Sequence, residues 1–167
     1  MNRRRFVALT VSTLPLGGCL SKAPTSDQST TPPPETETDV EKPMCPERPE
    51  SFTSDSALAF AIAFEKAYVK REVLQGHERV ISIDVSVDED LVEKAATQMN
   101  DGWVVRFTVT GPTYQYYPEP NSSETRHTDP PLYAANYLIT DQTILRAEAT
   151  EAVDPREAGS KVSCPPG

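Results

Sequence analysis

The 167-residue chain carries a net charge of −9, with an isoelectric point near 4.7. This excess of acid argues against nucleic acid as a partner, because phosphate binding requires clustered cations. Apolar residues make up 37% of the chain and there are 16 prolines, whereas an average globular domain is roughly 45–50% apolar. We therefore expect one folded domain and a separate segment that does not fold.

The first nineteen residues have the order of an export signal. Residues 3–5 are arginines, and residues 6–16 form a mildly apolar run. That run is shorter than the about 20 apolar residues that cross a bilayer, but it suits the core of a signal peptide. Two glycines then precede Cys19. The sequence predicts a signal peptide over residues 1–18; an uncleaved anchor or a chance Gly-Gly-Cys is the alternative.

These residues resemble two known signals. The arginines followed by Phe6 and Val7 are similar to the twin-arginine export signal, and residues 16–19 resemble the lipobox of lipoproteins. The resemblance implies that the sulfur of Cys19 carries a diacylglyceryl group and that membrane lipid is a partner. It also implies a location on the extracytoplasmic face of the cell membrane. A single lipid group holds a protein to a bilayer with modest strength.

Residues 19–44 are predicted to be a disordered tether. From Leu20 to Met44 the chain is poor in apolar residues and rich in Thr, Ser and Pro. Such a segment cannot bury enough surface to offset the entropy lost on ordering. Three consecutive prolines at 32–34 favour extended polyproline II. The tether is therefore a spacer between the membrane and a domain over residues 45–167.

Removal of residues 1–18 takes away three arginines and shifts the net charge from −9 to −12. Only six lysines are present. Acid-rich, lysine-poor chains resemble the proteins of salt-loving archaea, in which high salt screens the repulsion between carboxylates. An ordinary acidic extracellular domain is the alternative.

Two cysteines bound the predicted domain. Once Cys19 is lipidated, Cys45 and Cys164 remain, and each is followed by proline. Exported proteins occupy a compartment that permits disulfides, and two cysteines allow one pairing. The sequence predicts a Cys45–Cys164 disulfide, with two free thiols as the alternative. Neither cysteine has a recognisable basic partner, so no catalytic cysteine is predicted. Too few cysteines and histidines are present for a metal site, and no cofactor is expected.

Residues 54–75 are predicted to form a long helix. Thr53 or Ser54 can cap its start, and Gly76 is a natural stop. Apolar residues at helical spacing cover more than half of its circumference, so a large surface must cover it, most simply a curved sheet. A helix on a membrane surface is the alternative, although charges of both signs are mixed along it. The repeating apolar positions are Ala57, Phe60, Ala61, Phe64, Ala67 and Tyr68.

Four strands are predicted after the helix, because the apolar period changes to two. An Asn-Asp-Gly sequence at 100–102 predicts a hairpin turn. Residues 88–100 favour a continued strand with a bulge, and a short helix is the alternative. A polar loop is expected at 118–131 and an irregular tail after residue 150. The predicted strands are 81–88, 103–110 with an extension toward 116, 132–140 and 143–150.

The predicted fold is α+β: one long helix packed on a curved four-stranded antiparallel meander. This order of elements, over about residues 54–150, resembles cystatin-like and nuclear-transport-factor-like folds, in which a sheet curls around one helix. The Gln-x-Val-x-Gly inhibitory loop of cystatins is absent, because residues 108–111 lack the glutamine. Protease inhibition is therefore not implied. Together with its N-terminal signals, the chain resembles the small lipoproteins of haloarchaea, which implies no particular chemistry.

Tyrosines are the main candidates for a binding site. Tyr114 and Tyr116 share one strand face, and Tyr133 and Tyr137 share another. They predict either ordinary sheet packing or an exposed aromatic patch that binds a protein or glycan, because tyrosine is favoured at interfaces. Asn121 begins an Asn-Ser-Ser acceptor for N-glycosylation, which implies an exposed loop.

Histidines give little support to catalysis. His77 lies at the predicted helix end, where a cation is favoured. His127 and Asp129 lie in the polar loop, but no nucleophile accompanies them in a motif. We therefore predict no catalytic residue. The sequence predicts a membrane-anchored binding module on the outer cell face; the alternative is a small extracytoplasmic enzyme or a ligand-binding domain with a pocket inside the curved sheet.

Overall fold

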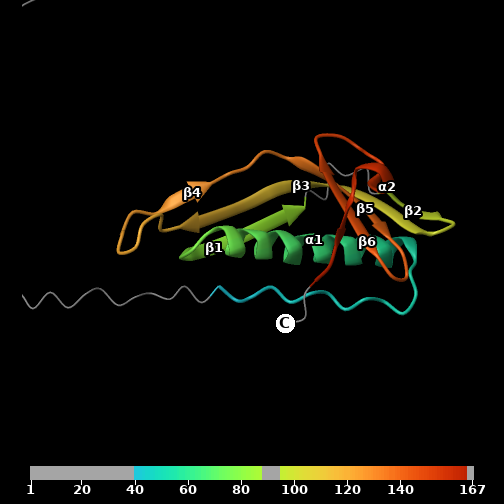
Figure 1. Cartoon of the computed structure of the whole chain (residues 1–167), viewed down its shortest axis with the longest axis horizontal. Helices are drawn as coiled ribbons and strands as arrows, with labels where there is room; N and C mark the ends of the chain where they lie inside the picture. The colour runs from blue at the N-terminus through green and yellow to red at the C-terminus, as the bar shows by residue number, and fades with distance from the viewer. Residues whose placement is uncertain (1–39, 88–94, 165–167) are drawn as a thin grey trace, which may run out of the picture. The chain divides into compact units, whose positions relative to one another are not determined.

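The structure is a computed structural model that describes residues 40–87 and 95–164 (Figure 1). The predicted signal peptide, Cys19 and most of the predicted tether lie outside the described residues. So do residues 88–94, over which strand and helix remained open. Among the described residues, no helix is long and apolar enough to cross a membrane.

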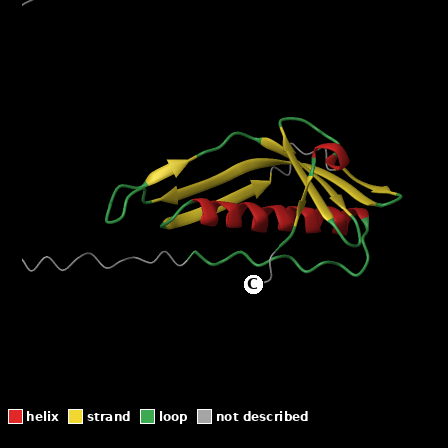
Figure 2. Ribbon diagram, viewed as in Figure 1, coloured by secondary structure: helices red, strands yellow, loops and turns green. Residues whose placement is uncertain are grey.

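The fold is α+β, with one long helix packed against an open antiparallel sheet, as predicted (Figure 2). The prediction of four strands is wrong, because the described residues alone form a sheet of seven. The elements are α1 (Ser54–Gly76), β1 (Val80–Val87), β2 (Ala95–Met99), β3 (Gly102–Tyr116), β4 (Arg126–Thr128), β5 (Tyr133–Ile139), β6 (Ile144–Ala149), α2 (Pro155–Ala158) and β7 (Ser160–Val162).

Strand β3 organises the sheet. It is 15 residues long, and the strand order is β1-β3-β5-β6-β7, with β2 and β4 also paired to β3. Strand β1 pairs with its second half and β2 with its first half, so both lie along one edge. On the other edge, β5 pairs with the first half and β4 with the last three residues. Strand β3 therefore pairs with four other strands, whereas each strand of a simple meander pairs with at most two.

Helix α1 begins where the sequence predicts. Thr53 is the N-cap, and its side chain and that of Ser56 form a reciprocal capping box. The helix runs to Gly76, one residue beyond the predicted end, and the backbone N–H of His77 donates to the carbonyl of Val73. The apolar face of the helix packs on the buried centre of the sheet. This core contains Ala57, Phe60, Ala61, Phe64, Val105, Phe107, Val109, Ala135, Tyr137 and Ile139.

An irregularity in β3 changes which side chains face the helix. Val105, Phe107 and Val109 are buried in the core beneath α1. Beyond them the register with β1 shifts at Gly111, which has a φ of +34°. An extra residue reverses the alternation of side chains, so the even-numbered residues that follow, Tyr114 among them, lie on the helix side. The bulge therefore directs the tyrosines of β3 toward the end of α1.

The predicted turn at 100–102 joins β2 to β3. Gly102 has a φ of +150°, and a Cβ atom there would collide with the carbonyl oxygen of Ile139. Only glycine fits this close approach between β3 and the end of β5. The turn is thus held against the neighbouring strand.

Candidate functional site

Four aromatic rings and one arginine gather at the C-terminal end of α1. The ring of His77 lies 4.9 Å from that of Tyr114 and 5.0 Å from that of Tyr116, measured between centroids. His77 Nε2 shares a hydrogen bond of 2.8 Å with the Tyr114 hydroxyl. The guanidinium of Arg79 lies 5.0 Å from the centroid of the Tyr117 ring. We call these five residues the aromatic platform.

The platform is half-buried and borders a hollow of about 250 Å³. The hollow is lined by aromatic rings, one cation and one carboxylate, with two prolines on its rim. Aromatic side chains with one edge exposed to solvent suit ligand binding, because they offer apolar area together with hydroxyl and imidazole groups. The hollow is lined by Gly76, His77, Glu78, Arg79, Tyr116, Tyr117, Pro118 and Pro120.

The other two predicted tyrosines belong to the core. Tyr137 is 0% exposed and stacks on Phe107, with centroids 5.9 Å apart. Its hydroxyl donates to Glu65 Oε2, and the hydroxyl of Tyr133 donates to Glu65 Oε1 at 2.6 Å. Of the two alternatives for these tyrosines, sheet packing therefore describes Tyr137, which lies in the core, and Tyr133, which is half-buried against it. Strand β5 lies over the middle of α1, where its inward side chains are covered.

Glu65 is the centre of a buried polar network. Its carboxylate is 0% exposed and accepts two hydrogen bonds from Arg146, at 2.8 Å from Nε and 2.7 Å from Nη2. Arg146 also bonds Glu148 at 3.0 Å and lies 4.8 Å from the centroid of the Tyr68 ring. Each charged group is thus paired and hydrogen-bonded, which a buried ion pair requires.

The network raises the pKa of its phenols. Burial, the nearby negative charge of Glu65 and the hydrogen bond to it hold the pKa of Tyr133 and Tyr137 well above the ordinary value of 10. Burial raises the pKa of Tyr68 as well. Burial lowers the pKa of Arg146, but the hydrogen bonds to Glu65 and its negative charge, together with the smaller effects of Tyr137 and Glu148, raise that pKa above its usual value.

Alkaline pH is expected to unfold the domain. The pKa of these tyrosines is higher in the folded chain than the value of about 10 in the unfolded chain. Below pH 10 the protonated phenols contribute their full stabilisation. Above pH 10 the unfolded chain releases these protons and the folded chain does not, so the contribution is lost as the pH rises. Absorbance at 295 nm should show a late group of tyrosines that ionises together with the loss of helical circular dichroism. In Tyr133→Phe/Tyr137→Phe this late phase should disappear; its persistence would assign it to other tyrosines.

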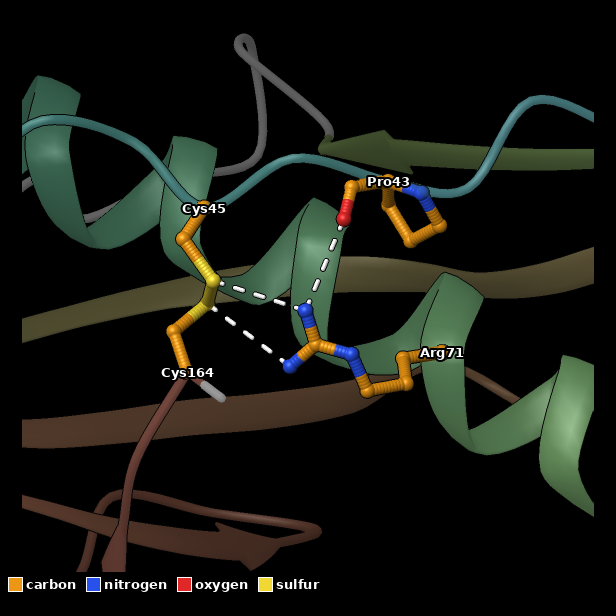
Figure 3. Close-up of a disulfide and its surroundings, with 4 residues drawn as sticks. All are labelled: Pro43, Cys45, Arg71 and Cys164. Carbon is orange, nitrogen blue, oxygen red and sulfur yellow. Dashed lines mark hydrogen bonds between the residues drawn. A yellow bond between two sulfur atoms is a disulfide. The ribbon is translucent and has the colours of Figure 1, made fainter. Parts of the chain in front are cut away.

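The predicted disulfide is present in the structure. Cys45 and Cys164 lie 119 residues apart in sequence, and their Cα atoms are 5.8 Å apart. Figure 3 shows the guanidinium of Arg71 beside both sulfurs, with Nη2 3.4 Å from Cys45 Sγ and Nη1 3.8 Å from Cys164 Sγ. Arg71 also donates to the carbonyl of Pro43 at 3.5 Å. No basic partner was recognisable near either cysteine in the sequence; the fold brings Arg71 to both of them from α1.

The remaining predicted residues lie outside the aromatic platform and the Glu65 network. His127 Nε2 is 3.6 Å from Asp129 Oδ1, and both side chains are mostly exposed. Asn121 is exposed in the loop before β4, as a glycosylation acceptor requires. Among residues 40–87 and 95–164, no group of three or more metal-ligating side chains is present.

No family model, curated protein or solved structure matches the chain. Sequence reasoning missed two residues that the structure makes central, Glu65 and Arg146. One signal was available, since Glu65 lies on the apolar stripe of the helix between Ala61 and Tyr68. A carboxylate in that position requires a buried partner.

Proposed function

We propose that the chain is a lipid-anchored lipoprotein of the extracytoplasmic face of the cell membrane, and that its domain is a binding module. Three sequence features support the anchor: the arginines at 3–5, the short apolar run and Cys19. The Cys45–Cys164 pair supports an oxidising compartment, because disulfides are rare inside most cells. Export by the twin-arginine route and a haloarchaeal origin remain part of this proposal.

The aromatic platform is the proposed binding surface, and its half-exposed rings are the observation that supports it. Tyr114 and Tyr116 lie on a bulged strand beyond the end of α1, so the helix does not cover them as it covers Tyr137. A protein or glycan that packs on these rings would gain apolar contact and hydrogen bonds at the rim. Nucleic acid is disfavoured, because the chain carries a net charge of −9.

Crosslinking of the full chain in its membranes tests the binding surface. We expect a stoichiometric partner with the native chain and its loss in Tyr114→Ser/Tyr116→Ser, while the melting temperature stays within a few degrees. Leu132→Ser is the matched control, since Leu132 is 52% exposed but lies outside the platform. A partner captured equally by all three chains, or by none of them, would contradict the proposal.

The anchor is tested by mass spectrometry of the same sample. We expect the peptide that begins at Cys19 to carry a lipid on its sulfur and to lack residues 1–18. Recovery of an uncleaved chain with a free thiol at Cys19 would contradict the lipoprotein proposal while leaving the binding surface to its own test.

A further inference from the structure

A second hollow, of about 850 Å³, lies at the end of the sheet where β2 turns into β3. Three segments border it: residues 48–52, which lead into α1, residues 98–103 of the turn and its flanks, and residues 139–143 between β5 and β6. We call it the terminal hollow. Its volume falls within the roughly 300–1,000 Å³ of small-ligand clefts.

The terminal hollow is remote from the aromatic platform. The platform lies at the C-terminal end of α1 and the hollow at its N-terminal end, so most of a 23-residue helix separates them, a length of about 34 Å. Pro43 contacts Arg71 in the last third of α1, and the segment from Pro43 to the start of α1 runs beside the helix toward the hollow (Figure 1).

The rims of the hollow are tied together. The guanidinium of Arg48 donates to the carbonyl of Thr140 and lies 5.4 Å from the centroid of the Phe52 ring. The backbone N–H of Thr140 donates to the carbonyl of Thr143 at 2.9 Å. The backbone N–H of Thr143 donates in turn to the hydroxyl of Thr140, also at 2.9 Å. Gly102 fixes the third segment against Ile139. These bonds form the shape before any ligand arrives, which lowers the cost of binding.

The lining combines aromatic rings with planar polar groups. Phe52 and Trp103 supply the rings; both are half-buried and pack partly on the core, and Arg48 lies over the Phe52 ring. The exposed part of the Trp103 ring offers an apolar surface to the C–H edge of a sugar. Amide and carboxylate groups then offer donors and acceptors to neighbouring hydroxyls. Anionic ligands are disfavoured, because three carboxylates line the hollow, whereas Arg48 is the one cation among the described residues of its lining. The polar side chains used in this argument are Gln98, Asn100 and Asp101, and the other carboxylates are Glu50 and Asp141.

Asp101 is the best-positioned acceptor. Arg156, from α2, donates to its two oxygens at 2.7 and 3.2 Å. This hydrogen bond lowers the pKa of Asp101, so its carboxylate stays ionised and fixed in direction. A charged, oriented acceptor at the rim strengthens a hydrogen bond to a ligand hydroxyl.

We propose that the terminal hollow is a binding site for a neutral oligosaccharide, with the ring of Trp103 under a sugar and Asp101 accepting from its hydroxyls. The proposal is independent of the aromatic platform, because the two surfaces share no residue. It assigns to the domain a glycan-binding activity of its own.

Trp103 provides the test, since it is the single tryptophan of the chain. The full chain, purified in detergent, is titrated with maltotriose, mannotriose and chitotriose and followed by tryptophan emission and by calorimetry. We expect saturable binding of at least one of them, with a dissociation constant below about 1 mM. Trigalacturonic acid, whose carboxylates meet those of the hollow, should bind at least about tenfold more weakly.

Three variants locate the binding. Asp101→Asn should weaken it by about tenfold or more, because a hydrogen bond to a charged acceptor is lost. Arg156→Gln breaks the same ion pair but keeps the carboxylate, so it should weaken binding only about two- to threefold. Tyr116→Ser, in the platform, should change nothing.

The proposal is overturned by any of three results. One is no saturable binding of any neutral trisaccharide by either method at millimolar concentration. Another is an equal loss of affinity in Arg156→Gln and Asp101→Asn, which would make the ion pair structural. The last is a loss in Tyr116→Ser, which would place the sugar on the platform.

Discussion

Glu65→Gln is expected to lower the free energy of unfolding by about 3–5 kcal/mol, the range for breaking one side of a buried ion pair. The substitution keeps the size of the side chain but leaves the Arg146 guanidinium buried without its counter-charge. It also turns an amide N–H₂ group toward hydroxyls that donate to Glu65 in the native chain. Urea denaturation followed by circular dichroism measures the loss.

Glu148→Gln is the matched control. Glu148 also bonds Arg146, at 3.0 Å, but its side chain is 54% exposed. An exposed ion pair contributes about 0–1 kcal/mol, so this variant should remain close to the native stability. If the two variants are destabilised equally, burial of the Glu65 pair does not determine its contribution.

A coupled variant separates charge from packing. Glu65→Leu and Arg146→Met each leave one buried partner without its counter-charge. The two together, with Tyr133→Phe and Tyr137→Phe, remove the Glu65 carboxylate and every side chain that donates a hydrogen bond to it. Buried ion pairs replaced in full by apolar side chains are often neutral in stability or better. We therefore expect the fourfold variant to be more stable than either single variant, and strict additivity would contradict this account.

The sequence predicts the helix and the long strands because each has a strong apolar period. Thr53 caps the helix within local reach, and the Asn-Asp-Gly turn requires only neighbouring residues. The three-residue strands β4 and β7 were not predicted, since three residues are too short to show an alternation. They are strands because their backbones pair with β3 and β6, and such pairing depends on tertiary contacts.

The tail after β6 shows the same limit. It was expected to be irregular, but it contains α2 and β7, and the backbone N–H of Val153 donates to the buried side chain of Asn136. Asn136 gives no local sign of this bond, because its partner lies 17 residues further along the chain.

The candidate sites were less predictable than the fold. Tyrosine spacing placed Tyr114 and Tyr116 on one face, but the shift at Gly111 brings them to His77, which the spacing did not indicate. Likewise, Arg146 reaches Glu65 across 81 residues of sequence. Pairings of this kind depend on register between distant strands, which local periodicity does not specify.

Removal of the disulfide is expected to lower the free energy of unfolding by about 2–5 kcal/mol in Cys45→Ser/Cys164→Ser. The bond closes a loop across a sequence separation of 119 residues, for which the chain-entropy model gives about 4–5 kcal/mol through restriction of the unfolded state. Folded-state contacts should change little, since Arg71 keeps its bond to the carbonyl of Pro43. Urea denaturation of both chains under non-reducing conditions measures the difference.

The same variant should also release the ends of the domain. Without the bond, no covalent link closes the segment before α1 against the tail after β7, and β7 itself pairs over only three residues. Limited proteolysis should then cut near residues 46–52 and 160–164 before the sheet, because local opening precedes global unfolding where contacts are sparse. Cys19→Ser, which leaves the bond intact, should match the native chain in both measurements. A double variant as stable and as protease-resistant as the native chain would mean that the sheet and helix alone hold these ends, and that the bond contributes nothing to the fold.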